Sequence, residues 1–269
     1  MNTGFIGIGS MGGMLVRALL SSGAIAPNNV YLANRSQGRL DALTAQFAGI
    51  HPVSNLQLAA RCDLIFVCVG PADLAAVLAA IDSELTPEKL LVTTSAAVPL
   101  QLLENRVPCR IAKLIPSITQ EIGAGIALLM YGSRITGEDR TLLEELLGRI
   151  SHPMVISESV ARPAVGLASG GPALIAYILQ SMVDEAVCNN PELSPELARQ
   201  LVQETVNATI RLTGEGNMAY EEIIRRVAVP GGMTALAIDI LSRYVPQAWR
   251  SVFQETAERE RKSRGSIVL

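Results

Sequence analysis

The sequence predicts an α/β chain in two parts, a doubly wound parallel sheet at the N-terminal end followed by an all-helical domain. Strand-like and helix-like patterns alternate through the first half, the strand signal ends near residue 158, and long helical patterns fill the remainder. We therefore expect two domains, at residues 1–158 and 159–269.

Seven strands are expected in the first half, with helical patterns between them. They lie near residues 3–8, 29–34, 64–69, 89–94, 110–115, 126–131 and 153–157. Several are apolar throughout, which is typical of central strands covered on both faces. Cofactor and substrate then belong at the carboxyl ends of these strands.

Helices are expected throughout the second half. The clearest patterns lie at residues 172–187, 195–212, 220–226, 233–244 and 247–262. Residues 173–179 and 235–241 are too apolar for a small solvated bundle, so we expect them to pack on another subunit. The prediction is a homodimer formed through this domain, with assembly beyond a dimer left open.

Composition agrees with a globular protein. The 269 residues are 49% hydrophobic and 17% charged, and the net charge is −3. Basic residues cluster only at residues 259–264, so no electrostatic footprint for nucleic acid or an acidic membrane is present in the sequence. The apolar runs have the length of strands and the chain begins in a predicted strand, so we expect a cytoplasmic protein with no membrane segment.

Cysteine and histidine give no indication of a metal site. The four cysteines form no Cys-x-x-Cys pair, and His51 and His152 lie far apart in the sequence. We expect neither a metal nor a disulfide framework.

A glycine motif follows the first predicted strand and opens a helical pattern. In Gly7-x-Gly9-x-x-Gly12, the first glycine permits a tight turn, the second lets the backbone approach a pyrophosphate, and the third allows close packing of helix and strand. Ser10 and Met11 lie inside the motif and are expected to contact the cofactor with it. The order of strand, motif and helix predicts a Rossmann-type dinucleotide site.

The second strand ends in Asn34-Arg35-Ser36, where such a site reads the adenosine ribose. An acidic residue would repel a 2′-phosphate, whereas Arg35 is able to pair with it and its two neighbours supply neutral hydrogen bonds. We therefore predict NADP(H) in preference to NAD(H). The alternative is that Arg35 is a solvated residue opening the next helix.

Two glycine-proline motifs in the helical half add a family resemblance. Residues 167–173 read Leu-Ala-Ser-Gly-Gly-Pro-Ala, and residues 229–234 read Val-Pro-Gly-Gly-Met-Thr. Both place backbone N–H groups at helix N-termini, which suits a carboxylate ligand. Together with the N-terminal Gly-Phe-Ile-Gly-x-Gly-x-Met, and in this order, they make the whole chain resemble the pyrroline-5-carboxylate reductase family.

The resemblance implies an NAD(P)H-dependent oxidoreductase that reduces a cyclic imine carboxylate, Δ1-pyrroline-5-carboxylate, to proline. It implies a Rossmann domain, a helical dimerisation domain and an active site between them. Pro230, Gly231 and Gly232 would bind the substrate carboxylate, and Thr234 would be the catalytic residue at the imine nitrogen. The remaining cofactor contacts implied by the resemblance are Asn55, Val69, Gly70, Pro71, Ala96 and Ala97.

Departures from the family pattern lie around the substrate site. The usual Met-Pro-Asn-Thr-Pro is Ile-Pro-Ser-Ile-Thr at residues 115–119, and Gly70 replaces a lysine. Residues 168–172 and 228–232 also lack usual hydroxyl groups. Each lost donor to a buried ligand costs about 1–3 kcal/mol. The pattern resembles the divergent, late-competence ComER-like branch.

Three alternatives remain at this stage. A β-hydroxyacid dehydrogenase shares the glycine opening but needs a lysine in the helical half, and no lysine occurs between Lys113 and Lys262. A catalytically weakened NADP(H)-binding protein with a competence-associated or regulatory role would fit the missing donors. A reductase of another imine carboxylate would fit the less polar pocket that Val229 gives.

Overall fold

The structure is a computed structural model that describes residues 1–264. The described chain divides into two compact units, one made of residues 1–172 with the segment from residue 257 onward, the other of Ala173–Thr256. Each unit is described by itself. The last five residues of the predicted domain 159–269 lie outside the described residues.

The first unit is built on one sheet of eight strands in the order β3-β2-β1-β4-β5-β6-β7-β8. Their bounds are β1 Thr3–Ile6, β2 Val30–Ala33, β3 His51–Pro52, β4 Leu64–Val67, β5 Leu90–Thr93, β6 Arg110–Ile115, β7 Ile126–Tyr131 and β8 His152–Val155. All neighbours are parallel except β6 and β7. The predicted doubly wound, mostly parallel sheet is confirmed. The strand β3 was not predicted, because its two residues are too few to form a readable pattern.

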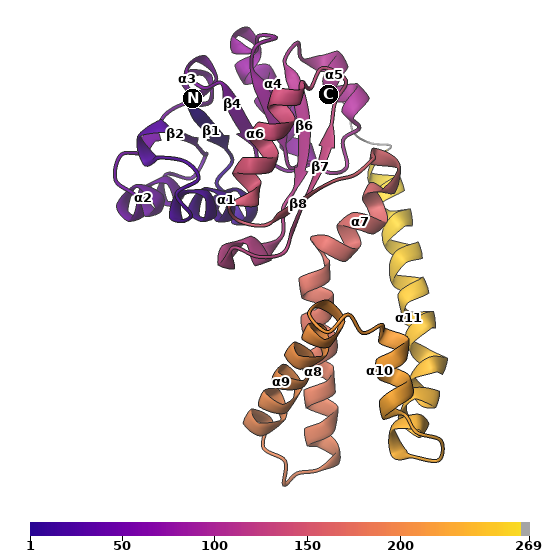
Figure 1. Cartoon of the computed structure of the whole chain (residues 1–269). Coiled ribbons are helices and arrows are strands. Elements are labelled where there is room, and N and C mark those ends of the chain that lie inside the picture. Colours follow the sequence, from indigo (N-terminus) through magenta and orange to yellow (C-terminus); the bar gives the residue numbers. More distant parts are fainter. Residues whose placement is uncertain (265–269) are drawn as a thin grey trace. The chain divides into compact units, whose positions relative to one another are not determined.

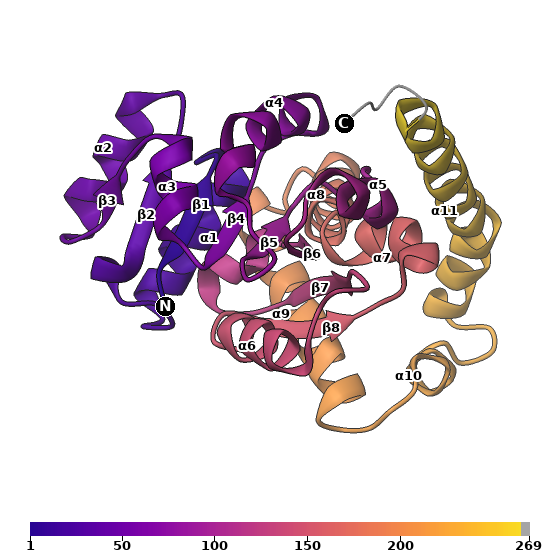
Figure 2. The same cartoon turned by 90° about the horizontal axis from the view of Figure 1, so that it is seen from above.

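Helices cover both faces of this sheet (Figures 1 and 2). Their bounds are α1 Ser10–Ser21, α2 Gln37–Gln46, α3 Asn55–Arg61, α4 Pro71–Ile81, α5 Leu100–Arg106, α6 Gly137–Gly148 and α7 Ala161–Ala168. Buried side chains of α1, α2 and α6 form one apolar cluster with the strands, and those of α3, α4 and α5 form the other. The helix α7 was not predicted separately; it packs on a third cluster with β6 and β7.

The central strands are fully buried, as their sequences predict. All four residues of β1 and of β4 are buried, and Phe5 stacks on Phe66 across the two strands with ring centroids 4.8 Å apart. Burying such a side chain contributes about 1.5–3 kcal/mol. The middle of the sheet is therefore a rigid platform for the loops at its carboxyl edge.

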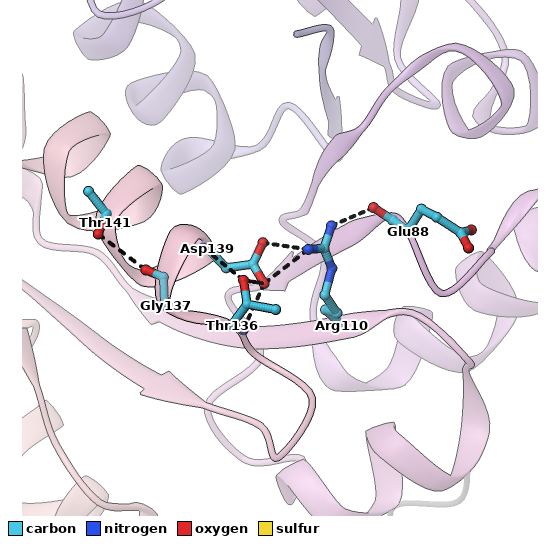
Figure 3. A network of polar contacts seen from close by, with 6 residues as sticks. All are labelled: Glu88, Arg110, Thr136, Gly137, Asp139 and Thr141. Atoms are coloured by element: carbon cyan, nitrogen blue, oxygen red, sulfur yellow. Dashed lines mark hydrogen bonds and ion pairs between the residues drawn. The ribbon is translucent and has the colours of Figure 1, made fainter.

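A charged network ties the start of β6 to the start of α6 (Figure 3). Arg110 Nη1 lies 2.9 Å from the carboxylate of Asp139, which is nearly fully buried, and Arg110 Nη2 donates to the Glu88 carbonyl. Asp139 also accepts from the Thr136 hydroxyl and backbone N–H, while the Thr136 hydroxyl caps α6 in return. This reciprocal capping box fixes α6 against the sheet.

The second unit is helical. It contains most of α8 Gly171–Asn189, all of α9 Pro195–Gly214 and α10 Tyr220–Val227, and most of α11 Met233–Arg264. The prediction of separate helices at residues 233–244 and 247–262 is wrong, because α11 runs through Pro246 without ending. Proline removes only one backbone hydrogen bond, and the helix-forming sequence on both sides outweighs that loss.

Large apolar side chains of this unit are exposed. On α8 they include Ile175, Tyr177, Ile178 and Met182, and on α11 Leu236, Ile240, Leu241 and Tyr244. Among the described residues, the stretch Glu158–Asn189 is, by length and composition only, apolar enough to cross a membrane, and 6% of its apolar 18-residue window is buried.

Candidate functional site

The turn from β1 into α1 has no room for a side chain at Gly7 or at Gly12. Gly7 adopts a φ of 92°, and a Cβ there would lie 2.6 Å from the Cys68 carbonyl oxygen. A Cβ on Gly12 would lie 2.0 Å from the Gly7 carbonyl oxygen. Both positions need glycine, the first for its backbone conformation and the second for the approach of helix to strand.

Gly9 differs from these two, because open space surrounds it. A Cβ there would meet only Arg39 Nη1, at 3.7 Å. Gly9 is the N-cap of α1 and no side chain caps this end, so the first N–H groups of the helix point outward without a side-chain acceptor. A pyrophosphate fits an exposed helix N-terminus beside a glycine, because no side chain blocks its approach to the backbone. We call the Gly7–Gly12 segment the glycine cradle.

The end of β2 is braced against the glycine cradle. Asn34 Oδ1 accepts the Ile8 backbone N–H at 2.9 Å, and Asn34 Nδ2 donates to the Ser36 carbonyl at 3.0 Å. This side chain therefore shapes the loop through internal hydrogen bonds. Ser36 is the N-cap of α2.

Arg35 has an acidic neighbour that the sequence did not indicate. Its Nη2 lies 3.3 Å from Asp73 Oδ2, in the first turn of α4. The Arg35 side chain is 89% exposed, so the pair is worth about 1 kcal/mol or less and a doubly charged phosphate is able to replace the carboxylate. The partners are 38 positions apart in the sequence, which explains why no local pattern indicated the contact.

A second arginine, Arg39, was missed by the sequence analysis. It lies on α2 and its Nη1 donates to the Ile8 carbonyl, with a distance of 3.3 Å. It lines the same cleft as Arg35. Its place in the first turn of α2, the helix that follows the Asn34-Arg35-Ser36 loop, was the signal that could have found it.

These elements enclose a cleft of about 380 Å³ at the carboxyl edge of β1, β2 and β4. The predicted residues that line it are Gly7, Gly9, Asn34, Arg35, Asn55, Val69 and Gly70. It is also lined by Cys68, and burial raises the pKa of this thiol to about 12, so it stays neutral. The structure thus brings half of the predicted cofactor residues into one cleft.

The other predicted cofactor residues lie outside this cleft lining. Ser10 lines an adjacent hollow of about 320 Å³ together with Arg17 and Arg39. The remaining positions fall in the first turn of α1, at the N-cap of α2, at the first residue of α4 and in the loop after β5; they are Met11, Gly12, Ser36, Pro71, Ala96 and Ala97.

The predicted substrate residues lie in the second unit. Pro230, Gly231 and Gly232 form the turn before α11, with φ of 77° at Gly231 and the Gly232 N–H donating to the Val229 carbonyl at 3.0 Å. Thr234 is exposed in the first turn of α11, a turn with no acidic residue. A helix start with no acidic side chain in its first turn is suited to a carboxylate.

The altered loop after β6 uses its hydroxyl groups internally. Thr119 Oγ1 donates to Ser117 Oγ at 2.9 Å, and the Ser117 N–H donates to Gln120 Oε1 at 3.1 Å. Ser117 and Gln120 are buried. The loop has therefore repacked around its own polar groups.

Within residues 1–264, no three His, Cys, Asp or Glu side chains are grouped as a metal site.

Two family profiles match the two parts of the chain. Residues 2–97 match the profile described as "NADP oxidoreductase coenzyme F420-dependent", and residues 158–263 match "Pyrroline-5-carboxylate reductase dimerisation". The dimerisation profile indicates a homodimer or larger oligomer.

Similar proteins cover nearly the whole chain. ComE operon protein 4 of Bacillus subtilis is 30% identical, over 95% of this chain and 94% of its own. Pyrroline-5-carboxylate reductase 3 of the same organism is 32% identical, over 94% and 93%. The crystal structure of Plasmodium falciparum pyrroline carboxylate reductase with NADP bound has the same fold, with a TM-score of 0.85 and 21% identity over 99% and 98% of the two chains.

A sheet with a glycine cradle, joined to this dimerisation domain, defines an NAD(P)H-dependent oxidoreductase that acts on a carbon–nitrogen bond. Its relatives make the identification narrower. The chain belongs to the pyrroline-5-carboxylate reductase family, a family of NADP-binding reductases. The similarity to ComE operon protein 4 confirms the predicted resemblance to the ComER-like branch.

Proposed function

We propose that this protein uses NADP(H) to reduce a cyclic imine carboxylate, with Δ1-pyrroline-5-carboxylate as substrate and proline as product. The observation that carries the proposal is the presence, in one chain, of an open glycine cradle at α1 and a Pro-Gly-Gly turn at the start of α11. The similarity to pyrroline-5-carboxylate reductase 3 over 94% of the chain supports the choice of substrate.

The preference for NADP(H) over NAD(H) is proposed from two cations. Arg35 and Arg39 line the cleft beside the end of β2, where the adenosine ribose of a bound dinucleotide is read. The Arg35 guanidinium is paired with the exposed carboxylate of Asp73. A 2′-phosphate is the stronger acceptor for a guanidinium, because it carries more charge.

The substrate carboxylate is proposed to bind at the start of α11. The turn of Pro230, Gly231 and Gly232, with its positive φ at Gly231, leads into the first turn of α11, which has no acidic residue and whose backbone N–H groups favour an anion. Thr234 is proposed to hydrogen-bond the imine nitrogen with its exposed hydroxyl.

The chemistry makes modest demands on the protein. When bound, the nicotinamide supplies a hydride to the imine carbon. The imine is largely an iminium near neutral pH, so the chain needs no strong acid. Its residues have to hold the imine carbon in line with the transferred hydride and to exclude water. The proposed catalytic contribution of this chain is therefore orientation.

We further propose a homodimer through the helical half, residues 159–269, with residues 1–158 as the dinucleotide-binding domain. A partner subunit would cover the exposed apolar side chains of α8 and α11, including those of the stretch Glu158–Asn189. On this basis the protein is proposed to be cytoplasmic.

A second candidate has one observation in its favour. The 30% identical relative is named for the ComE operon and not for a reductase, and the hydroxyl groups of Ser117 and Thr119 are hydrogen-bonded to each other. A chain with NADP(H) binding, weakened catalysis and a regulatory role would combine these features.

Steady-state oxidation of NADPH, followed by absorbance, separates the two candidates when it is combined with a fluorescence titration of NADPH. With Δ1-pyrroline-5-carboxylate we expect turnover, and with Thr234→Ala we expect kcat to fall about 100-fold while the Kd for NADPH stays unchanged. Thr234→Ser is the matched control and should retain most activity. Tight NADPH binding without turnover would favour the regulatory candidate.

A further inference from the structure

Lys113, in the middle of β6, is fully buried and takes no part in the function proposed above. A buried ammonium is costly unless charged and polar partners surround it. The Lys113 Nζ forms an ion pair with Glu158 Oε1 and donates to the Ala96 carbonyl oxygen at 3.3 Å. One cation thus holds two segments that are 62 residues apart in the sequence.

Glu158 extends these connections to a third segment. It begins the short helix η4, Glu158–Val160, between β8 and α7, and its side chain is 30% exposed. The same oxygen that meets Lys113 also accepts the backbone N–H of Leu100, the first residue of α5, at 3.0 Å. The β5–α5 loop is therefore fixed at Ala96 by the cation and at Leu100 by the carboxylate.

This loop lies where the far half of a dinucleotide belongs. Lys113 pairs with Thr93, the last residue of β5, so the cation lies level with the carboxyl end of that strand. The glycine cradle and Arg35 occupy the β1 and β2 side of the sheet. A dinucleotide crosses the carboxyl edge of such a sheet, so its second nucleotide lies over β4, β5 and the loop after β5.

We infer that Lys113, with Glu158, is a positioning residue that sets the β5–α5 loop for the nicotinamide half of the cofactor. This inference rests on the proposed binding of NADP(H). Lys113 Nζ donates to the Ala96 carbonyl oxygen, and Glu158 accepts from the Leu100 N–H. The ion pair between Lys113 and Glu158 thus joins the β5–α5 loop to the segment that leads into α7. Ala96 also packs in one apolar cluster with Ala164, Val165 and Ala168 of α7, so the loop and this helix are connected twice.

A control with similar chemistry lies on the same strand. Arg110 and Asp139 form a partly buried ion pair at the amino end of β6, away from the carboxyl edge (Figure 3). Its loss should affect folding without touching the cofactor loop. The variants Lys113→Met, Glu158→Gln and Asp139→Asn therefore separate positioning from stability.

The test compares two ligands on the full-length protein. NADPH is titrated by fluorescence, and 2′,5′-ADP, which shares only the adenosine end, is titrated by competition. We expect Lys113→Met and Glu158→Gln to raise the Kd for NADPH at least about tenfold and to leave that for 2′,5′-ADP within about twofold. Lys113→Arg should recover part of the loss, and Asp139→Asn should lower Tm and change neither Kd.

Several outcomes overturn the inference. If both ligands weaken equally, or neither weakens, Lys113 is only structural. If Lys113→Met does not fold, Glu158→Gln decides, because that side chain is partly exposed and keeps its size. Wild-type protein that binds neither ligand contradicts the proposed function itself, and the inference with it.

Discussion

At the scale of single residues, the proposed preference for NADP(H) rests on two arginines of the cleft, Arg35 and Arg39. We expect Arg35→Ala and Arg39→Ala each to raise the Kd for NADPH by about tenfold, since a charge-assisted hydrogen bond is worth about 1.5–3 kcal/mol. The Kd for NADH should not change, because that ligand has no 2′-phosphate. Fluorescence titration of both cofactors measures this.

The matched control for the arginines is Arg61→Ala, which removes an exposed positive charge at the end of α3 outside the cleft lining. It should leave both affinities unchanged. Equal loss of NADH and NADPH affinity in Arg35→Ala, or NADH bound as tightly as NADPH by the wild type, would overturn the 2′-phosphate assignment.

Two buried thiols give a pH dependence with a definite sign. Burial raises the pKa of Cys62 from 9.0 to about 12 and that of Cys109 to about 11. The unfolded chain loses these protons near pH 9 while the folded chain keeps them, so this contribution to the free energy of unfolding is complete below pH 9 and falls as pH rises from 9 to about 11 for Cys109 and to about 12 for Cys62.

The measurement for the thiols is alkylation with iodoacetamide at pH 8, followed by mass spectrometry. Cys62 and Cys109 should stay unmodified in the native protein and react fully in urea, because the thiolate is the nucleophile and both side chains are buried. Modification of either thiol in native protein at the rate of a free peptide would show that the assigned burial is wrong.

At the scale of elements, the contact between β1 and α1 depends on Gly12. Its missing Cβ would lie 2.0 Å from a backbone oxygen that no rotamer change is able to move. We expect Gly12→Ala to abolish measurable NADPH binding and to lower Tm, because α1 has to move away from β1. Gly38→Ala is the control: it lies in α2 with nothing within 4 Å of the added Cβ, and should stabilise by about 0.5–1 kcal/mol.

The same element shows what the sequence allows one to predict. The strand, turn and helix of residues 3–21 were predictable because each signal is local: an apolar run, glycines at fixed spacing, and a helical pattern. The pair of Arg35 with Asp73, and that of Lys113 with Glu158, were not, because only the folded sheet brings these residues together. Pro246 predicted a break between two helices, but α11 continues through it because the residues on both sides favour a helix.

Predicted site residues divide in the same way. Gly7, Gly9 and Arg35 line the cleft, and the family resemblance led to further lining residues such as Asn55 that no local pattern indicates. Arg39 was missed because a lone arginine on a helix is ordinarily a solvated residue. The role of the Pro230 turn and Thr234 stays a prediction.

At the scale of the whole molecule, the exposed apolar faces of α8 and α11 predict assembly. Light scattering should give at least twice the chain mass of 28.6 kDa. We expect Ile175→Asp, on α8, to shift the protein toward monomer, because a buried unpaired charge costs several kcal/mol. Ile122→Asp is the control, since this residue is 82% exposed in the first unit. A wild-type monomer, or an Ile175→Asp variant with unchanged mass, would contradict this interface.

The proposed reaction of this molecule is the transfer of a hydride from NADPH to the imine carbon of a cyclic imine carboxylate. The most direct test is to incubate the purified protein with Δ1-pyrroline-5-carboxylate and NADPH deuterated at the transferring position, and to analyse the product by mass spectrometry. We expect proline with one deuterium on the former imine carbon, not on the carbon that bears the carboxylate, formed at about 1 s⁻¹ or faster. NADPH bound tightly but not oxidised, with no labelled proline, would contradict it.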